Sequence, residues 1–128
     1  MGAGFGHPRY ESRPAVDWAG ARIAVELVSG KWVLPVMAVL ASGPRRHGDL
    51  FRAVGQGVSE KMLTETLRRM EATGLVVRRL LRGEATAVVY ALTPLARSLE
   101  GPLAAMARWT DEHRDDLGSR SRPGPSRA

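Results

Sequence analysis

The sequence predicts one mainly α-helical domain that carries a single β-hairpin. Apolar residues recur at helical spacing through most of residues 15–117. The pattern changes only at 75–81 and 87–92, where runs rich in β-branched residues flank a glycine-containing turn. The chain has 128 residues, of which 44% are hydrophobic, so one domain with an ordinary core is expected.

The two ends of the chain differ in composition from its centre. Residues 1–14 are polar and contain glycine and proline, which predicts a flexible N-terminal arm. Residues 118–128 contain only Gly, Ser, Arg, Pro and Ala, which predicts a disordered basic tail. The folded domain is therefore expected to span residues 15–117.

The first helix is expected over Asp17–Val28. Trp18, Ile23 and Leu27 place an apolar stripe along it at helical spacing. Ser29-Gly30 should end this helix, because glycine is a poor residue for a helix interior.

A second helix is expected in the segment KWVLPVMAVLAS, residues 31–42, with Ser29 as its cap. The segment is apolar on nearly every side, which predicts a buried central helix. Pro35 lies just past the first turn and should kink the helix slightly, because proline has no backbone donor. Gly43-Pro44 should end it.

A pair of helices should follow. The first is short, about eight residues, begins at Arg45-Arg46 and turns Leu50, Phe51 and Val54 inward. Gly55-Gln56-Gly57 forms the turn between the two helices. The second helix should run over Ser59–Ala72 with Ser59 as N-cap and Gly74 as its C-terminal stop. Its buried face should consist of Leu63, Leu67 and Met70.

A β-hairpin and a last helix complete the domain. The hairpin pairs residues 75–81 with 87–92 around the turn RGEAT. Thr93 should cap the last helix, with Pro94 at its first position, and the helix should continue to Trp109 with a kink at Pro102.

A short helix, a glycine turn, a second helix and a hairpin together form a winged helix-turn-helix arrangement. The second helix of the pair would enter the major groove of DNA, which is wide enough to admit a helix. Thr64 and Arg68 on its exposed face are then expected to select the base sequence, and Arg46 and Arg82 to bind phosphates.

The charge of the chain agrees with a nucleic-acid partner. The net charge is +6 and the isoelectric point is near 11.0, which favours a polyanion. Seventeen of the nineteen basic residues are arginine, so compositional drift in a GC-rich genome is an alternative explanation of the arginine content. Lys61 and Glu65, and Glu65 and Arg69, are also spaced i,i+4, so these charges could form a solvated, ion-paired face instead.

Four segments of the chain carry specific motifs, which are GKW at 30–32, RRHGDL at 45–50, VSEKMLTETLRRMEATGLV at 58–76 and VVYALTPLARSL at 88–99. In the order and spacing of these motifs, the chain resembles the HxlR family of bacterial winged-helix regulators over roughly residues 15–115. The resemblance implies a homodimeric transcription factor whose N- and C-terminal helices form the dimer interface, and which reads a near-palindromic operator. The residues that match the family's DNA-binding positions are Arg46, Ser59, Lys61, Met62, Thr64 and Arg68.

Three departures from the family pattern bear on function. Several members sense oxidants through a cysteine, whose place here is near Ala19, but this chain contains no cysteine and thiol-based sensing is not expected. His47 stands where the family usually has phenylalanine, and it is either a solvated residue or a titratable sensor. Pro35 interrupts a helix that is usually continuous aliphatic sequence.

Aromatic and methionine side chains on the helices expected at the dimer centre suggest a binding site for an effector molecule. They would meet at the dimer centre and could line a pocket for a small aromatic effector, or they could simply fill the core and the interface. These residues are Trp18, Trp32, Met37, Met106 and Trp109.

Other classes of protein are less well supported by the sequence. No phosphate-binding glycine loop, nucleophile elbow or catalytic carboxylate pair is present, so we expect no enzyme, no catalytic residue and no cofactor. The acids around His113 in TDEHRDD are better explained as a solvated helix end than as a metal site. No signal peptide or membrane span is predicted, and the expected location is the cytoplasm, on the nucleoid.

Two alternative functions keep the same fold. A winged helix could bind a protein partner without binding DNA, in which case DNA affinity would lack a steep dependence on salt. The chain could also sequester a drug, and would then bind its ligand without Arg68. Among regulators, a repressor is the expected type, because steric occlusion of a promoter needs no activator surface.

Overall fold

The computed structural model describes residues 15–83 and 85–118. The predicted N-terminal arm, and residues 119–128 of the predicted tail, lie outside the described residues. The elements are α2 (Trp18–Val28), α3 (Val33–Leu40), β1 (Arg45–Arg46), α4 (His47–Val54), α5 (Glu60–Ala72), β2 (Val76–Leu81), β3 (Ala87–Leu92), α6 (Pro94–Ser98), α7 (Glu100–Glu112) and α8 (Arg114–Leu117).

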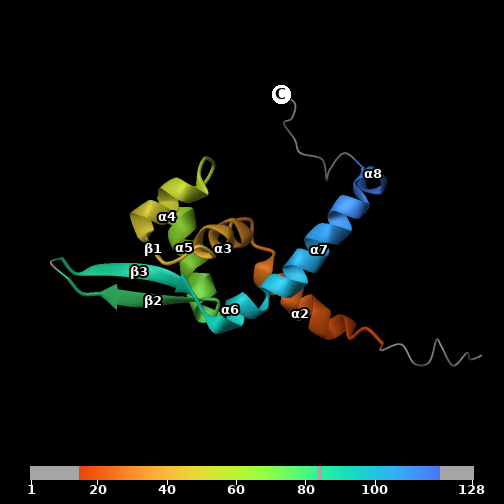
Figure 1. The fold of residues 1–128 in the computed structure, drawn as a ribbon, viewed down its shortest axis with the longest axis horizontal. Coiled ribbons are helices and arrows are strands. Elements are labelled where there is room, and N and C mark those ends of the chain that lie inside the picture. The colour runs from red at the N-terminus through yellow and green to blue at the C-terminus, as the bar shows by residue number, and fades with distance from the viewer. Residues whose placement is uncertain (1–14, 84, 119–128) are drawn as a thin grey trace, which may run out of the picture.

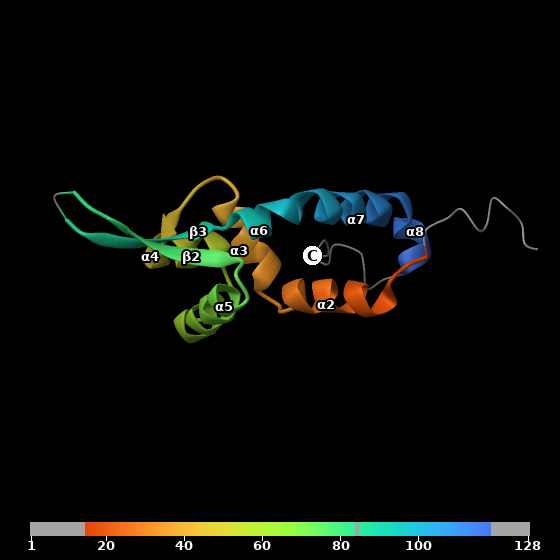
Figure 2. The same cartoon turned by 90° about the horizontal axis from the view of Figure 1, so that it is seen from below.

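The elements form a central body with two extensions. Helices α3, α4 and α5 pack together beside a small sheet, and the β2–β3 hairpin projects from this body on one side (Figure 1). Helices α2 and α7 extend from the body on the opposite side (Figure 1 and Figure 2). This arrangement is the predicted winged helix-turn-helix, in which α4 and α5 are the helix pair and the hairpin is the wing.

One hydrophobic core holds the central body together. Helix α5 contributes the three residues that its periodicity predicts, and each is at most 1% exposed. Helix α3 contributes four residues, which confirms its central position, although its Leu34 is 43% exposed. The buried cluster consists of Val33, Val36, Met37, Leu40, Leu50, Val58, Leu63, Leu67, Met70, Leu75, Val76, Leu92 and Ala96.

The sheet has three antiparallel strands in the order β1-β3-β2, one more than the sequence predicts. The extra strand is β1, in which Arg45 pairs with Tyr90 and Arg46 pairs with Val89. The expectation that these two arginines begin the first helix of the pair is therefore wrong. Arg46 has an extended backbone and occupies the N-cap position, so α4 itself starts at His47.

Three of the four residues that were predicted to cap or stop a helix do so. The Ser59 side chain accepts a hydrogen bond from the backbone N–H of Met62, and that of Thr93 accepts one from Ala96. Helix α5 ends with Gly74 at a φ of 87°. Ser29, however, does not cap α3. It follows α2, and its hydroxyl donates to the carbonyl oxygen of Glu26.

Pro35 differs from its prediction, whereas the last helix is interrupted near Pro102 as the proline predicts. Pro35 is the third residue of α3, where backbone N–H groups have no partner inside the helix, so it removes no helical hydrogen bond and no kink is required. The predicted last helix is two helices, α6 and α7, that meet at Leu99. Pro102 cannot donate to the carbonyl of Ser98, four residues earlier, which explains why α6 ends there.

Helices α2 and α7 contain no buried residue. Both nevertheless carry large apolar side chains, and the exposed fractions are 76% for Trp18, 63% for Ile23, 55% for Met106 and 52% for Trp109. Within the described ranges, no single helix has the length and apolar character needed to cross a membrane, although α2 and α3, bent by 73°, satisfy that test when taken together.

Candidate nucleic-acid interface

Helix α5 presents a polar face opposite its buried one. Lys61 and Arg68 are exposed and Thr64 is half-buried between them. Their spacing of three and four residues places them on one side of the helix, away from the buried leucines. A helix held in this way by its apolar side can offer the polar side to a groove of DNA.

The N-terminus of α5 is capped and open to solvent. The Oγ of Ser59 lies 3.0 Å from the backbone nitrogen of Met62 and accepts its hydrogen bond. The side-chain hydroxyl of Ser59 still has a hydrogen to donate. Met62 is 37% exposed at the same end of the helix. The positive end of the helix dipole and a hydroxyl donor together favour a phosphate group at this position.

Charged residues of the exposed face are not tied to one another. Within the described ranges, no ion pair joins Lys61, Glu65 or Arg68 to a neighbour. Arg78 of β2, in contrast, pairs with Glu71 of α5 through Nε and Oε2 at 3.0 Å, and so connects the wing to the helix. The guanidinium of Arg68 is therefore available to an external partner, whereas that of Arg78 has one inside the protein.

The arginines outside α5 occupy two different situations. Arg46 is exposed beside the start of α4, and Arg82 is exposed where β2 leads into the turn of the wing. Arg45 is only half-exposed, and its guanidinium donates to the carbonyl oxygens of Gly43 and Pro44. It thus closes the loop before β1, whereas Arg46 and Arg82 are exposed to solvent.

A hydrogen bond that the sequence does not indicate joins the two helices of the pair. The Nε2 atom of His47, the first residue of α4, lies 3.0 Å from Oγ1 of Thr64. The His47 ring also meets the ring of Tyr90 edge-on, with centroids 6.4 Å apart. Seventeen residues separate His47 from Thr64, and no periodicity or motif relates positions at that distance.

A small polar cleft lies between α5 and the sheet. It has a volume of about 180 Å³ and is lined by polar residues of α5, β2 and β3. Thr64 and Arg68 reach it from the helix, and Arg78 and Tyr90 reach it from the strands. The candidate base-reading residues therefore border a pocket that opens at the same surface.

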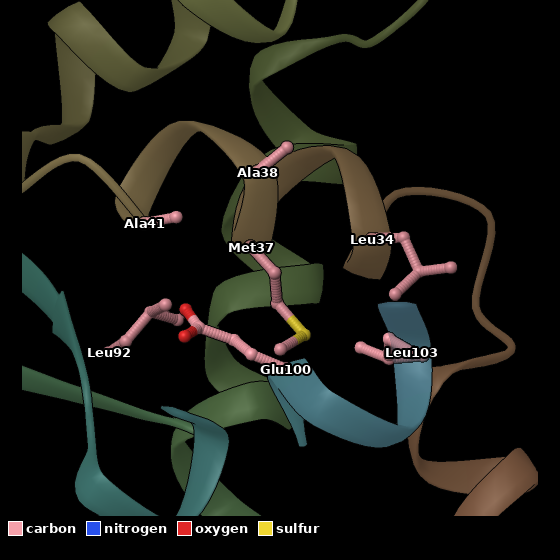
Figure 3. Close-up of a pocket in the computed structure, with 7 residues that line it drawn as sticks. All are labelled: Leu34, Met37, Ala38, Ala41, Leu92, Glu100 and Leu103. Atoms are coloured by element: carbon pink, nitrogen blue, oxygen red, sulfur yellow. The ribbon is translucent and has the colours of Figure 1, made fainter. Parts of the chain in front are cut away.

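The five residues predicted for an effector site lie in different places. Met37 is 5% exposed and lines a groove of about 230 Å³ between α3, the end of β3 and the start of α7 (Figure 3). Met106 lines a second, apolar groove of about 260 Å³ between α2, α3 and α7. Leu34 and Leu103 line both grooves, so the two adjoin.

The three tryptophans are not brought together with these methionines. The ring of Trp32 lies against Gly57 in the turn of the helix pair, where a Cβ added to the glycine would come within 3.3 Å of it. Trp18 is exposed on α2. Trp109 stacks on His113 of the same chain with ring centroids 4.8 Å apart. Leu34, Pro102 and Leu103, which line the grooves, were not among the residues predicted for an effector site.

Comparison with known proteins gives a consistent family match. The model of a family described as HxlR-like helix-turn-helix matches residues 27–117. The chain is 36% identical over 90 residues to a Bacillus subtilis protein named uncharacterized HTH-type transcriptional regulator YkvN, which covers 70% of this chain and 75% of that protein.

Solved structures show the same fold. A transcriptional regulator of the MarR family from Enterococcus faecalis aligns with a TM-score of 0.72 and 30% identity over 82% of this chain and 94% of that one. The reduced form of the transcriptional regulator YodB from Bacillus subtilis aligns with a TM-score of 0.66 and 28% identity, covering 82% and 91% of the two chains. The relatives found are transcriptional regulators, and no enzyme family is indicated.

Proposed function

The chain belongs to the HxlR-like helix-turn-helix family of transcriptional regulators, and from this premise we propose that it represses transcription as a homodimer bound to a near-palindromic operator. Each protomer would place α5 in a major groove. Because the chromosome is the target, the proposed place of action is the cytoplasm, on the nucleoid. Repression follows if the bound dimer occludes a promoter, which requires no contact with other proteins.

The observation that carries the proposal is the exposed face of α5. Lys61, Thr64 and Arg68 lie opposite a fully buried apolar face, and the described structure gives neither Lys61 nor Arg68 an ion-pair partner. In our proposal Thr64 and Arg68 contact base edges, while Lys61 and the capped helix terminus contact the backbone. Arg46 and Arg82 would bind phosphates on either side.

The proposed dimer is supported by the two outer helices. Neither α2 nor α7 buries a residue within the protomer, although both expose large apolar side chains. Exposed apolar surface of this extent is typical of an interface between proteins. A second copy of the chain, related by two-fold symmetry, would cover both helices. The two α5 helices would then lie about one turn of DNA apart, so the operator would have two half-sites separated by roughly 10 base pairs.

The proposed effector is a small aromatic molecule in the adjoining grooves beside Met37 and Met106. The second groove is lined by side chains of α2, α3 and α7, so a ligand there would contact both dimerisation helices and the core of the DNA-binding body. Methionine adapts its shape to flat apolar ligands. The chain contains no cysteine, so the proposal does not include thiol oxidation.

The test of the proposed function is in vitro selection of DNA bound by the full chain, followed by a salt titration on the enriched sequence. We expect a near-palindromic motif bound at least a thousandfold more tightly than random DNA, with a steep salt dependence. If no motif is enriched, and the weak binding disappears at physiological salt, the α5 face does not read sequence.

The effector proposal has a separate test. A panel of flat aromatic compounds is added to the complex of the dimer with its selected operator, and release is measured by fluorescence anisotropy. Release should be lost or weakened by Met106→Lys, because a charge in the apolar groove opposes an apolar ligand. Since Met106 lies on α7, sedimentation equilibrium and operator affinity must first establish that this variant still binds as a dimer. If none of the compounds releases the DNA, this part of the proposal fails while operator binding stands.

A further inference from the structure

The hydrogen bond between His47 and Thr64 lies within the candidate reading surface. Thr64 is on the exposed face of α5, and His47 begins α4 beside the exposed Arg46. Nε2 and Oγ1 are 3.0 Å apart, which is a good hydrogen-bond distance. Both residues are half-buried, so the bond is partly shielded from water, while Thr64 remains accessible from the cleft that Arg68 and Tyr90 also line.

This bond restricts the side chain of Thr64. Threonine in a helix divides between two rotamers, in which its hydroxyl and its methyl group point in different directions. A hydrogen bond to His47 selects the rotamer in which Oγ1 points toward α4. The two groups read different features of DNA, since a hydroxyl bonds to polar base edges and a methyl contacts the C5-methyl of thymine. Fixing the rotamer therefore determines whether a base pair contacts the hydroxyl or the methyl group of Thr64.

The bond also assigns the hydroxyl hydrogen. A threonine hydroxyl has one hydrogen to donate and two lone pairs to accept with. If Nε2 carries the imidazole proton, His47 donates and Thr64 keeps its hydrogen for a DNA acceptor. If Nε2 is unprotonated, Thr64 donates to His47 and presents only lone pairs to DNA. In either tautomer, His47 determines the hydrogen-bonding role that is left to Thr64.

The position of His47 is itself held by the fold. Its ring contacts the Tyr90 ring at an interplanar angle of 62°, an edge-on geometry that is favourable for aromatic pairs. Tyr90 is in β3, which pairs with β1 immediately before His47. The histidine thus has support from the sheet on one side and contacts the recognition helix on the other.

We propose that His47 is a specificity-determining positioning residue, which sets the base preference of this regulator by holding Thr64 in one rotamer and one hydrogen-bonding role. The inference rests on the proposed function, because it requires that α5 reads DNA. It assigns His47 no contact with DNA, and its effect is confined to the base pair that Thr64 meets in each half-site.

The experiment repeats the in vitro selection with the full-length chain carrying His47→Phe, His47→Gln or Thr64→Val. Phenylalanine keeps a ring against Tyr90 but cannot form the hydrogen bond, whereas glutamine keeps a hydrogen-bonding group. Valine keeps the shape of threonine without its hydroxyl. Thr73→Val, at the C-terminal cap of α5, is the matched control for a threonine change on the same helix. Thermal unfolding of each variant establishes that it is folded.

We expect His47→Phe to change the base preference at one symmetric pair of operator positions and to lower the specific-to-random affinity ratio about fivefold, as expected for one hydrogen bond. Thr64→Val should alter the same positions, and the double variant should be no worse than either single one, since both remove the same bond. His47→Gln should restore most of the preference. Thr73→Val should leave the motif unchanged.

The negative results of this experiment distinguish a failure of the inference about His47 from a failure of the proposed function. If the unmodified chain selects a motif but His47→Phe keeps it at the same ratio, His47 does not position Thr64 and only this inference is overturned. If His47→Phe and His47→Gln weaken binding to specific and random DNA equally, the role of His47 is structural, and the inference is again overturned. If the unmodified chain selects no motif, the proposed function fails and the inference falls with it.

Discussion

At the scale of single residues, the arginines of the proposed DNA-binding surface have two proposed roles. A guanidinium that meets a base edge discriminates between sequences, whereas one that meets a phosphate adds affinity to all of them. Arg68 on the helix face and Arg82 at the wing turn are both exposed, but they lie on different elements. Their replacement should therefore have different consequences.

Arg68→Ala should reduce discrimination between operator and random DNA by about 1–3 kcal/mol, the usual value of a base contact. The measurement is the ratio of the two dissociation constants by anisotropy. Arg69→Ala is the matched control, because Arg69 is the next residue, is also exposed, and lies toward Gly30 instead of the reading face. Equal ratios for Arg68→Ala and the unmodified chain would show that the reading face is wrongly assigned.

Arg82→Ala should weaken binding to operator and random DNA alike, because a phosphate contact carries no sequence information. The slope of log affinity against log salt should become shallower by about one unit per protomer. A salt titration on both DNAs measures this. Arg97→Ala, on α6 and paired with Glu100 of α7, should leave the slope unchanged. A change in base preference with Arg82→Ala would instead indicate a groove contact.

At the scale of elements, the ends of α5 show how local chemistry positions the face that we propose reads DNA. Ser59 satisfies the N–H of Met62 at one end. At the other end, the N–H of Gly74 donates to the carbonyl of Glu71 and that of Leu75 to the carbonyl of Met70, which is the Schellman arrangement. The chain turns sharply there and enters β2, so the wing is anchored directly to the helix that it flanks.

Gly74→Ala should destabilise the fold by about 1–2 kcal/mol, because Gly74 has a φ of 87°, a region that costs an L-residue this much. Steric overlap adds little, since the nearest atom to an added Cβ is Cδ2 of Leu95 at 3.5 Å. Denaturant unfolding measures the change.

Gly48→Ala, inside α4, is the control and should be neutral or stabilising by up to about 1 kcal/mol, because alanine is the better helix former. Equal effects of the two substitutions would show that the backbone conformation of Gly74 is not the cause.

At the scale of the whole molecule, the protomer is divided between a packed body and two apolar helices that it does not bury. Arg22 and Glu26 of α2 pair with each other at 3.0 Å, so the charges on that helix are matched within it. Both α2 and α7 also expose large apolar side chains, and water is a poor solvent for them. Association of two protomers would remove that surface from water.

Ile23→Glu should split the proposed dimer, because Ile23 is 63% exposed on α2 and a carboxylate would have to be desolvated in the interface. Sedimentation equilibrium should show a monomer with an unchanged circular dichroism spectrum, and operator affinity should fall as both half-sites can no longer be bound together. Leu81→Glu is the matched control for oligomeric state, since Leu81 is 51% exposed but lies on the wing. A dimer that survives Ile23→Glu would place the interface elsewhere.

Much of the molecule follows from interactions between residues close together in the chain. The helical stripes of α2, α3, α4 and α5, the caps at Ser59 and Thr93 and the stop at Gly74 depend on contacts within one or two turns, and each was predictable from spacing. The polar face of α5 was predictable for the same reason, because the position of its buried face also determines the opposite one. The resemblance in motifs to a known family agreed with the family match.

The rest required residues far apart in the sequence to meet. Strand β1 is two residues long and is defined only by its pairing with β3. The local sequence pattern therefore could not predict this strand. The bond between His47 and Thr64, the separation of Trp32 from the methionine-lined grooves and the exposure of α2 and α7 all depend on how the elements pack. The sequence by itself thus determined the hairpin, most of the helices and the helix proposed to read DNA, because periodicity and capping are local. Only the tertiary structure decided which side chains support Thr64 and which apolar surfaces remain open, because those contacts join distant segments.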